Sequence, residues 1–319
     1  MPNQFLLTFD VEDFINVESL RALSSILNLL EKYGLKAVFF ITGHMAEKLA
    51  LHPEITRSLM VHEIGFHSSA HSVHPTIFEY CDVERYEDAY YASVKRETSH
   101  VDPLSGKIEE EGGILALGKL FPNKNIRAYR APGCCCPPPN LEAMAGLGIR
   151  YDFSWSVSNG LVNYKGITFY PKPIFRDCDN ALLGSDVQII SWSRLIWSIL
   201  TREMTVLDFH PQSLVEKGFW DSAYHMGNPL QLKRTLLRDS KEIQSKLAKL
   251  EVLLKRVHNL EKVGVIETSP NLMKSKTCLD TTKLDIDELA DDFSYWPKTF
   301  FGYEPKYLRS QLLEFFELD

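Results

Sequence analysis

The sequence predicts an α/β fold in which parallel strands form a sheet or barrel and helices cover its outside. Short apolar runs alternate along the chain with segments in which apolar residues recur at helical spacing. Several of these runs end in an acidic, basic or histidine side chain, as in folds whose chemistry lies at the carboxyl ends of parallel strands. With 319 residues, 45% of them hydrophobic, the chain is long enough to bury one large core.

In the first half of the chain, the buried strands are expected at Phe5–Asp10, Lys36–Ile41 and His62–Phe66. Apolar residues recur at helical spacing from Leu20 to Leu30, and Gly34 is placed to end that helix. A further helix is predicted over Val83–Glu97.

In the second half, extended segments are expected at Ile126–Tyr129, Ile149–Phe153, Val187–Ser191, Thr205–Phe209 and Val263–Ile266. One helix is predicted over Asn140–Leu147, with Asn140 as its N-cap and Gly148 after its end. Leu230–Leu260 is expected to form a long helix or a helix pair.

The composition changes after about Ser269, where an acidic segment is followed by an aromatic-rich one and a short amphipathic one. These three segments are Leu284–Asp292, Phe293–Tyr303 and Tyr307–Phe316. We therefore expect one main domain over residues 1–268 and a C-terminal helical extension, residues 269–319, packed on its core.

Charge and the N-terminal residues limit the classes of function. The net charge of -7 is spread along the chain, and no basic run indicates a surface for nucleic acid. The N-terminus lacks the basic and apolar segments of a signal peptide, and no span of about 20 apolar residues could cross a bilayer. A cytoplasmic protein without a nucleic-acid partner or a transmembrane segment is the expectation.

Six cysteines occur, at Cys81, Cys134, Cys135, Cys136, Cys178 and Cys278. Three are adjacent, and neighbouring cysteines bridge only in a strained ring, so the spacing does not indicate a secreted disulfide framework. A thiolate metal cluster is the alternative, but it would need another spaced pair such as C-x-x-C, which the sequence lacks. Reduced thiols are therefore expected.

The first candidate site follows the first predicted strand, where Asp10, Glu12 and Asp13 lie within four positions. Residues i and i+2 of an extended segment share a face, so Asp10 and Glu12 are expected to project into one site. Carboxylates held this close are costly unless a cation or a proton lies between them. The alternative is a cluster of acids at the start of the next helix, where negative charge is favourable.

A histidine-rich segment is the second candidate, with His62, His67, His71 and His74 within thirteen residues. The spacing of His67 and His71 places both imidazoles on one face if the segment turns helically, as a metal site needs. Gly65 lets the backbone leave the strand. His62 and His74 are expected outside the ligand set. Two histidines and one carboxylate would leave positions for a water and a substrate oxygen.

Two later segments offer further polar groups at strand ends. Arg130 is suited to hold a carboxylate through two hydrogen bonds, and the backbone N–H of the turn at Pro132-Gly133 is placed to face a developing oxyanion. His210 ends an apolar run and is suited to act as a general acid. The alternatives are a surface arginine beside a turn and a structural histidine.

In chain order these segments resemble the motifs of the polysaccharide deacetylase family, also called the NodB homology domain. The family has a T-F-D strand end, an H-[S/T]-x-x-H element, an R-x-P turn and a late strand that ends in His-Pro. This chain has T-F-D at 8–10, H-S-S-A-H at 67–71, R-A-P at 130–132 and H-P at 210–211. Residues 148–154 also resemble the family's stretch after the arginine turn, and the resemblance covers about residues 5–268.

The resemblance implies a distorted (β/α) barrel of the polysaccharide deacetylase type, with fewer than eight regular units. It also implies hydrolysis of an N-acetyl or O-acetyl group on a sugar. By the match of motifs, Asp10 would be the general base, His67 and His71 would be metal ligands, and Arg130 would orient Asp10.

The same resemblance implies the remaining roles. The N–H of Gly133 would help to hold the oxyanion, and His210 would be the general acid. Leu207 would line a small pocket for the acetyl methyl group, and Pro132 and Cys134, in the turn after the arginine, are expected to contact the substrate.

This sequence departs from the family's pattern in two places. The usual paired aspartates are replaced by D-V-E-D at 10–13, so the third metal ligand is ambiguous. The shared-face argument favours Glu12, and Asp13 is the alternative. The arginine turn continues into C-C-C-P-P-P at 134–139, where the prolines stiffen the loop and the small thiols would leave the cleft open.

The predicted function is therefore metal-dependent removal of an acetyl group from an acetamido sugar, and the expected location favours an intracellular glycan precursor. One divalent metal ion is implied, and Zn²⁺ suits the ligand set, although Co²⁺, Ni²⁺ or Fe²⁺ would fit the same ligands. The alternatives are a non-sugar C–N amide hydrolase on the same fold and a catalytically silent carbohydrate-binding protein. Neither the sugar nor the oligomeric state follows from the sequence.

Overall fold

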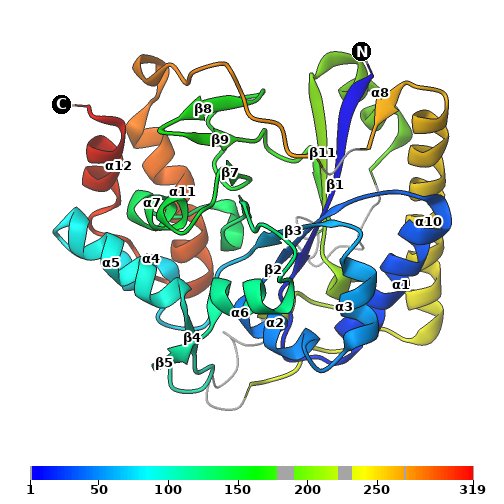
Figure 1. Cartoon of the computed structure of the whole chain (residues 1–319), viewed down its shortest axis with the longest axis horizontal. Helices are drawn as coiled ribbons and strands as arrows, with labels where there is room; N and C mark the ends of the chain where they lie inside the picture. The colour runs from blue at the N-terminus through cyan, green and yellow to red at the C-terminus, as the bar shows by residue number, and fades with distance from the viewer. Residues whose placement is uncertain (1, 178–189, 222–231, 269–270, 319) are drawn as a thin grey trace.

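A ten-stranded sheet, mostly parallel, runs through the computed structural model, which describes residues 2–177, 190–221, 232–268 and 271–318 (Figure 1). The strands of this sheet are β1 (Asn3–Val11), β2 (Val38–Ile41), β3 (Glu63–Phe66), β6 (Ala128–Tyr129), β7 (Tyr151–Asp152), β8 (Val162–Tyr164), β9 (Ile167–Phe169), β10 (Phe175–Arg176), β11 (Met204–Phe209) and β12 (Ile266–Glu267). Their order is β10-β11-β1-β2-β3-β6-β7-β9-β8, and β12 pairs with the start of β1. All neighbours are parallel except β8 and β9, so the predicted parallel α/β class is confirmed.

The sheet curls into an open, distorted barrel. Arg130 directly follows β6, three strands from β1 and four from β11 in the sheet order. In a flat sheet these separations would be roughly 14 and 19 Å. The Arg130 guanidinium nevertheless donates hydrogen bonds to Asp10 of β1 and Asp208 of β11. The curl therefore brings the carboxyl ends of distant strands to one place.

Helices cover the outside of the sheet on two sides (Figure 1). They are α1 (Glu18–Tyr33), α2 (Gly43–Leu49), α3 (Pro53–Leu59), α4 (Ile77–Cys81), α5 (Tyr86–Glu97), α6 (Gly113–Leu120), α7 (Pro138–Gly146), α8 (Trp192–Thr201), α10 (Ser240–Lys262), α11 (Ile286–Phe301) and α12 (Leu308–Phe316). The helices α1 and α10 lie side by side on one flank, and α4, α5, α7, α11 and α12 gather on the other. A small antiparallel pair, β4 (Ser99–Val101) and β5 (Ile108–Glu111), lies outside the main sheet.

The strands and helices predicted for the first half of the chain are found, although β2 begins at Val38 rather than Lys36 and α5 at Tyr86 rather than Val83. The strand β1 is buried along most of its length because it has neighbours on both edges and helices on its faces. The helix α1 buries its leucine-rich face and ends at Gly34, which has a φ of 65°. That left-handed conformation strongly favours glycine.

Several boundaries in the second half were predicted wrongly. Asn140 lies inside α7, where its side chain accepts a hydrogen bond from the Tyr129 hydroxyl, and Pro137 is the N-cap. The long helix begins only at Ser240, because Asp239 forms a capping box there with Glu242. Residues 230–231 of that prediction lie outside the described ranges, and residues 232–239 are not helical.

The strand predicted at 187–191 was also not found in the part that the structure describes. Residues 187–189 lie outside the described ranges, and Ser191 is instead the N-cap of α8. The strands β8, β9 and β10 were missed, because runs of two or three residues are too short to show a periodic pattern.

The C-terminal helices pack on the rest of the chain through aromatic side chains. The Trp155 ring contacts the rings of Phe293, Phe315 and Phe316, with centroids 4.9 to 5.9 Å apart. The predicted helical character of this segment is confirmed by α11 and α12. Its division from the barrel at residue 268 stays a prediction.

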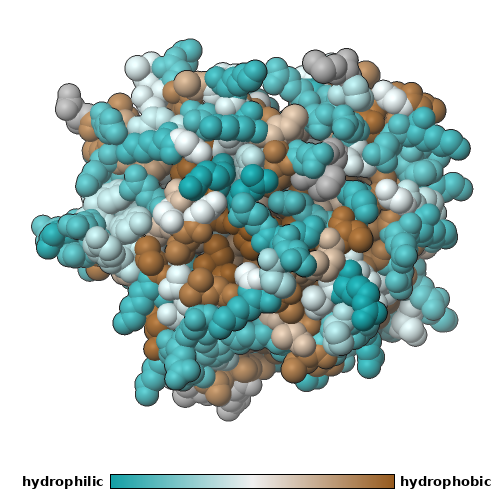
Figure 2. Space-filling model, in the orientation of Figure 1, coloured by the Kyte–Doolittle hydropathy of each residue, from teal (hydrophilic) through white to brown (hydrophobic). Residues whose placement is uncertain are grey.

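The surface is mostly hydrophilic, although hydrophobic side chains are exposed near α6 and α11 on the face shown in Figure 2. Among the described helices, none has the length and apolar character needed to cross a membrane. The five cysteines that the structure describes are all free thiols, and Cys178 lies outside the described ranges.

Candidate active site

Glu12 and the two histidines of the predicted metal site converge beyond the carboxyl ends of β1 and β3. The Oε2 atom of Glu12 lies 2.8 Å from Nε2 of His67 and 3.1 Å from Nε2 of His71. Its Oε1 atom accepts hydrogen bonds from the side chains of Gln212, at 3.0 Å, and Trp220, at 2.8 Å. All three predicted ligands are at least 97% buried, so the carboxylate is held rigidly against the imidazoles.

Of the two acids that competed for the third ligand position, only Glu12 faces the histidines. Asp13 turns toward the start of α1, where its Oδ1 accepts hydrogen bonds from the backbone N–H groups of Ile15 and Asn16. Its Oδ2 accepts from the side chains of Asn16 and Ser19. Asp13 therefore has the alternative role considered for these acids, which is to cap the chain at the entry to a helix.

The histidine loop, residues 67–72, is not helical, so the helical turn that would place both imidazoles on one face is not the geometry used here. Ser68 and His71 have φ angles of 67° and 45°, so the backbone twice adopts the left-handed conformation. This path brings the ring centroids of His67 and His71 to 5.2 Å. The two imidazoles face one point because of the loop conformation rather than because of helical spacing.

Two buried charged residues at the end of α5 support this loop. Glu97 accepts a hydrogen bond from the backbone N–H of Ser69 at 2.7 Å, and Arg96 donates to the hydroxyl of Ser68 at 2.8 Å. Arg96 also contacts the backbone carbonyl of His71 at 3.5 Å and pairs with Glu97. These contacts offset the cost of the unusual backbone conformation.

The donor set fits a divalent metal ion. Nδ1 of His67 lies 2.7 Å from the backbone carbonyl of Arg130. A carbonyl oxygen only accepts, so Nδ1 carries the hydrogen, and Nε2 is the nitrogen available to a metal when the ring is neutral. Ligand atoms of Glu12, His67 and His71 all lie within 4.8 Å of one another. Two imidazole nitrogens and one carboxylate oxygen are a common ligand set for Zn²⁺.

Asp10 lies between this cluster and His210. Its Oδ2 atom is 3.7 Å from Nε2 of His67 and 3.7 Å from Nε2 of His210. Its Oδ1 atom accepts a hydrogen bond from Arg130 at 2.7 Å. Burial raises the pKa of Asp10 above its ordinary value, although the charge of Arg130 acts in the opposite direction.

Glu12 has the opposite electrostatic balance. Burial alone would raise its pKa, but the charge of His71 and the hydrogen bonds with His67 and His71 outweigh that effect. The pKa of Glu12 is therefore held well below its ordinary value. Glu12 is thus the carboxylate suited to stay ionised, and Asp10 is the one suited to exchange a proton.

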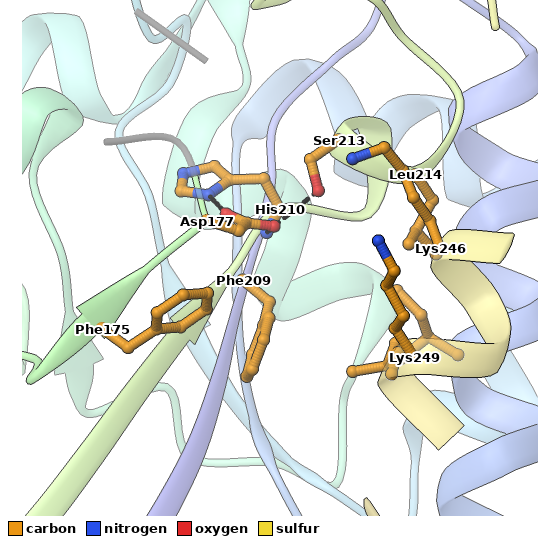
Figure 3. Close-up of a pocket in the computed structure, with 10 residues that line it drawn as sticks. Phe175, Asp177, Phe209, His210, Ser213, Leu214, Lys246 and Lys249 are labelled. Atoms are coloured by element: carbon orange, nitrogen blue, oxygen red, sulfur yellow. Dashed lines mark hydrogen bonds and ion pairs between the residues drawn. The ribbon is translucent and has the colours of Figure 1, made fainter. Parts of the chain in front are cut away.

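His210 is oriented by an acid that the sequence analysis did not select. Asp177, directly after β10, contacts Nδ1 of His210 with its Oδ1 atom at 2.7 Å. Its Oδ2 accepts hydrogen bonds from the backbone N–H of His210, at 2.9 Å, and from the hydroxyl of Ser213. Figure 3 shows the Asp177 carboxylate between the His210 ring and Ser213. The ring is thereby fixed with Nε2 toward Asp10.

A second pocket lies behind the Asp177–His210 pair. Phe175 and Phe209 line it from the sheet, and Lys246 and Lys249 line it from α10 (Figure 3). Its lining includes none of the three predicted metal ligands, so we place the candidate chemistry in the other cavity.

The cavity in front of His210 contains the predicted ligands, Asp10 and an aromatic wall. It is lined by Asp10, Glu12, His67, His71, Gly133, Cys134, Arg176, Asp208, His210, Phe219, Asp221, Tyr295, Trp296 and Phe300. Three of these aromatic residues come from α11, so the C-terminal segment forms part of the cavity. The aromatic wall packs closely against the turn at Gly133. A Cβ added to Gly133 would lie only 2.3 Å from the Trp296 ring.

Two of the residues expected to contact the substrate do not line this cavity. Leu207 is completely buried in the hydrophobic core, because side chains alternate along β11 and its neighbour Asp208 takes the cavity side. Pro132 is also buried and absent from the lining. Gly133, with a φ of 65°, and Cys134, with a φ of 56°, do line it.

The sequence did not point to several residues at or beside the cavity, which include Asp177, Asp208, Gln212, Trp220 and Trp296. A carboxylate inside an apolar strand was a visible signal for Asp208. Asp177 follows a strand of only two residues, and Trp296 reaches the site from a helix far along the chain, so neither had a local signal.

In a comparison with protein families, the N-terminal part of the chain matches one family model. Residues 2–111, which contain Asp10, Glu12, His67 and His71, match the family model for polysaccharide deacetylase. The resemblance inferred from the motifs is therefore confirmed for residues 2–111, and the matches of the later motifs at 130–132 and 210–211 stay predictions. A search by sequence finds no match among curated proteins.

Several solved structures are similar at low identity. A protein from Bordetella bronchiseptica, described as a polysaccharide deacetylase involved in O-antigen biosynthesis, is 16% identical, with 77% of this chain and 90% of that chain covered and a TM-score of 0.39. A family 4 carbohydrate esterase from Streptomyces lividans, in complex with acetate, is 13% identical, with 86% and 98% covered and a TM-score of 0.42. A CE4 family pseudoenzyme from Bacillus anthracis is 13% identical, with 66% of this chain and 57% of that chain covered and a TM-score of 0.37.

Proposed function

We propose that this chain, whose residues 2–111 match the polysaccharide deacetylases, is a metal-dependent hydrolase that removes an acetyl group from an acetamido sugar. The observation that carries the proposal is the position of Asp10. Its Oδ2 atom lies 3.7 Å from Nε2 of a predicted metal ligand on one side and 3.7 Å from Nε2 of His210 on the other. A base and an acid thus flank one cavity beside a metal-binding donor set.

Asp10 is proposed as the general base. Arg130 and burial hold its carboxyl group in place, and the raised pKa increases its affinity for the proton of an attacking water. Arg130 is proposed to position Asp10 rather than to contact the substrate, because its side chain is fully buried.

His210 is proposed as the general acid. Asp177 accepts a hydrogen bond from Nδ1, so Nε2 is the nitrogen that faces Asp10 and the cavity. In the reaction, a water oxygen adds to the amide carbonyl carbon and Asp10 takes the water proton. The C–N bond then breaks, the leaving nitrogen takes a proton from His210, and acetate and a free amine are released.

Glu12, His67 and His71 are proposed to hold the metal ion. A divalent cation bound there would polarise the carbonyl and lower the pKa of the attacking water; we propose Zn²⁺, with Co²⁺, Ni²⁺ or Fe²⁺ as alternatives. Gly133 lines the same cavity, and its backbone N–H is proposed to donate to the oxyanion.

The aromatic wall supports a sugar as the substrate. Tyr295, Trp296 and Phe300 from α11 and Phe219 line the cavity, and their rings offer apolar faces with polar groups nearby. Tyr295 is 64% exposed, so its ring is accessible from solvent.

We propose a glycan precursor in the cytoplasm as the source of that sugar. The partly exposed free thiol of Cys134 in the cavity supports a reducing compartment, because an accessible thiol stays reduced there. Fractionation of cells and assay of acetate release in each fraction would test this location.

The direct test is acetate release from N-acetylhexosamine derivatives. We expect release that a chelator abolishes and added divalent metal restores. Asp10→Asn should lower kcat by about 10²- to 10⁴-fold, since it removes the base. Glu54→Gln is the control, because Glu54 is an exposed residue of α3 and should leave the rate unchanged.

Two results would contradict the proposal. Turnover of imides or ureides without acetate release from any sugar would indicate a non-sugar C–N hydrolase. Sugar binding by the metal-loaded protein without any turnover would indicate a silent binding protein.

A further inference from the structure

Asp208 places a carboxylate in the candidate active site that the reaction described above does not use. It lies inside β11, is 1% exposed and lines the same cavity as Asp10 and His210. Residues i and i+2 of a strand share a face, so Asp208 and His210 project to the same side. Ligand atoms of Asp10, Asp208 and His210 all lie within 4.8 Å of one another.

The two oxygens of Asp208 have different surroundings. Oδ1 accepts hydrogen bonds from Arg130 and, at 3.1 Å, from the hydroxyl of Thr8. Oδ2 is buried and accepts no hydrogen bond from the residues that the structure describes. The guanidinium of Arg176 is near it, but Nε is 4.0 Å away, beyond hydrogen-bond distance. A buried acceptor without a donor is costly unless a ligand supplies one.

This part of the cavity is poorly suited to a methyl group. The family resemblance implies an apolar side chain from this strand against the acetyl methyl, and Leu207 was expected there. Leu207 faces the core instead, and the cavity side carries Asp208, with Arg176 and Cys134 also in the lining. An apolar acyl tail would leave Oδ2 of Asp208 desolvated and without a hydrogen-bond donor among the residues that the structure describes.

We propose that Asp208 determines acyl specificity by accepting a hydrogen bond from an O–H on the substrate's acyl group, so that a hydroxyacetyl amide is preferred over an acetyl amide. This inference rests on the proposed function and refines its substrate class. One carboxylate oxygen of Asp208 lies within 4.8 Å of ligand atoms of Asp10 and His210, so the Asp208 carboxylate is close to the reacting carbonyl, and we place the hydroxyl donor on the adjacent carbon.

The chemistry is otherwise that of amide hydrolysis. Water adds to the carbonyl carbon, the C–N bond breaks, and the leaving nitrogen takes a proton. The products are hydroxyacetate and the free amine. Asp208 exchanges no proton in this scheme and acts only through the hydrogen bond to the hydroxyl.

The alternative ligand at Asp208 is a second metal cation, bound between Asp10, Asp208 and His210. Asp10, Asp208 and His210 offer ligand atoms at suitable separations. Arg130, however, already donates hydrogen bonds from Nη1 to both Asp10 and Asp208, so one guanidinium charge already offsets part of the negative charge of these carboxylates. The substrate hydroxyl is therefore the occupant that the contacts favour.

The test compares kcat/KM for hydroxyacetyl and acetyl amides of the same hexosamine. We expect the wild-type protein to prefer the hydroxyacetyl amide at least tenfold, because a site built to bind a hydroxyl rejects the analogue that lacks it. Asp208→Asn keeps an acceptor for Arg130 and Thr8 but places an NH₂ donor where Oδ2 was. The preference should then fall to about one.

Thr8→Val is the matched control, because it removes the hydroxyl that binds Oδ1 of Asp208 and Nη2 of Arg130 without altering Oδ2 of Asp208. It should lower both rates and leave their ratio unchanged. An equal or greater rate on the acetyl amide, or a ratio that Asp208→Asn does not alter, would overturn the inference while leaving the proposed deacylation intact. Release of neither acid from any sugar amide would instead contradict the proposed function.

A binding measurement keeps the inference testable when turnover is absent. Calorimetric titration of the metal-loaded protein with hydroxyacetate and with acetate should show tighter binding of hydroxyacetate, and Asp208→Asn should remove the difference. Equal binding of the two acids would overturn the inference. Two metal ions per chain in the wild-type protein and one in Asp208→Asn would also overturn it, in favour of the second cation.

Discussion

At the scale of single residues, Glu12 and Asp13 are adjacent acids with different partners. Glu12 contacts two imidazoles, whereas Asp13 binds backbone N–H groups at the entry to α1. We predict that Glu12→Gln loses stoichiometric metal and that Asp13→Asn keeps about one ion per chain, because only the first change removes a charged donor from the site. Elemental analysis of the two purified variants checks this, and metal retained only in Glu12→Gln would assign the ligand to Asp13.

The comparison of Glu12 with Asp13 also shows which site residues could be assigned from the sequence alone. The alternation of an extended chain was sufficient to favour Glu12 over Asp13, because β1 continues to Val11 and leaves Asp10 and Glu12 on one side. It was insufficient for β11, where the resemblance placed Leu207 in the site and the register of the strand placed Asp208 there instead. Which face of a doubly buried strand meets the cavity depends on the curl of the sheet.

At the scale of elements, the histidine loop depends on the end of α5. Arg96 and Glu97 are both at most 1% exposed, and they bind the loop at Ser68 and Ser69. We predict that Arg96→Met lowers the free energy of unfolding by about 3–5 kcal/mol, because Glu97 is left as an unpaired buried charge. Metal affinity should fall as well, since Arg96 also contacts the His71 carbonyl.

Chemical denaturation and calorimetric metal titration measure these two effects. Arg85→Ala is the control, because Arg85 lies just before the same helix, is 70% exposed in its side chain and forms its ion pairs with Glu87 and Asp88 on the surface. It should change stability by less than about 0.5 kcal/mol. A small effect of Arg96→Met on both measurements would show that the loop keeps its conformation without this support.

The elements differ in how far the sequence could specify them. Strands of four or more apolar residues, such as β2 and β11, and the long helix α1 were predicted because their patterns extend over several residues. The strand β10 has only two residues and was not predicted, because it forms by pairing with β11 rather than from a pattern of its own. Such strands depend on the assembled sheet, so no local pattern marks Asp177 as a partner of His210.

At the scale of the whole molecule, the buried acid Glu216 makes the free energy of unfolding depend on pH. Glu216 is 1% exposed, and burial together with the nearby charge of Asp13 raises its pKa to about 12. Its ordinary value is 4.5. Below pH 4.5 the group is protonated in both states, so its contribution to stability is fully present. Above that pH the unfolded chain loses the proton and the folded chain keeps it, so stability falls as the pH rises toward 12.

Glu216→Gln should therefore flatten the dependence of stability on pH. The amide cannot ionise, and its oxygen still accepts the hydrogen bond that Asn16 donates to Glu216 at 2.7 Å. Between pH 6 and pH 8, the wild-type group costs about 1.4 kcal/mol per pH unit, so the variant should gain about 2–3 kcal/mol over the wild type across that interval. Urea denaturation at pH 6, 7 and 8 measures the difference, with the exposed-site variant Glu54→Gln as control. If the free energy of unfolding changed with pH equally in the wild type and Glu216→Gln, Glu216 would be ionised in the folded protein. The surrounding groups would then stabilise the negative charges of both Asp13 and Glu216.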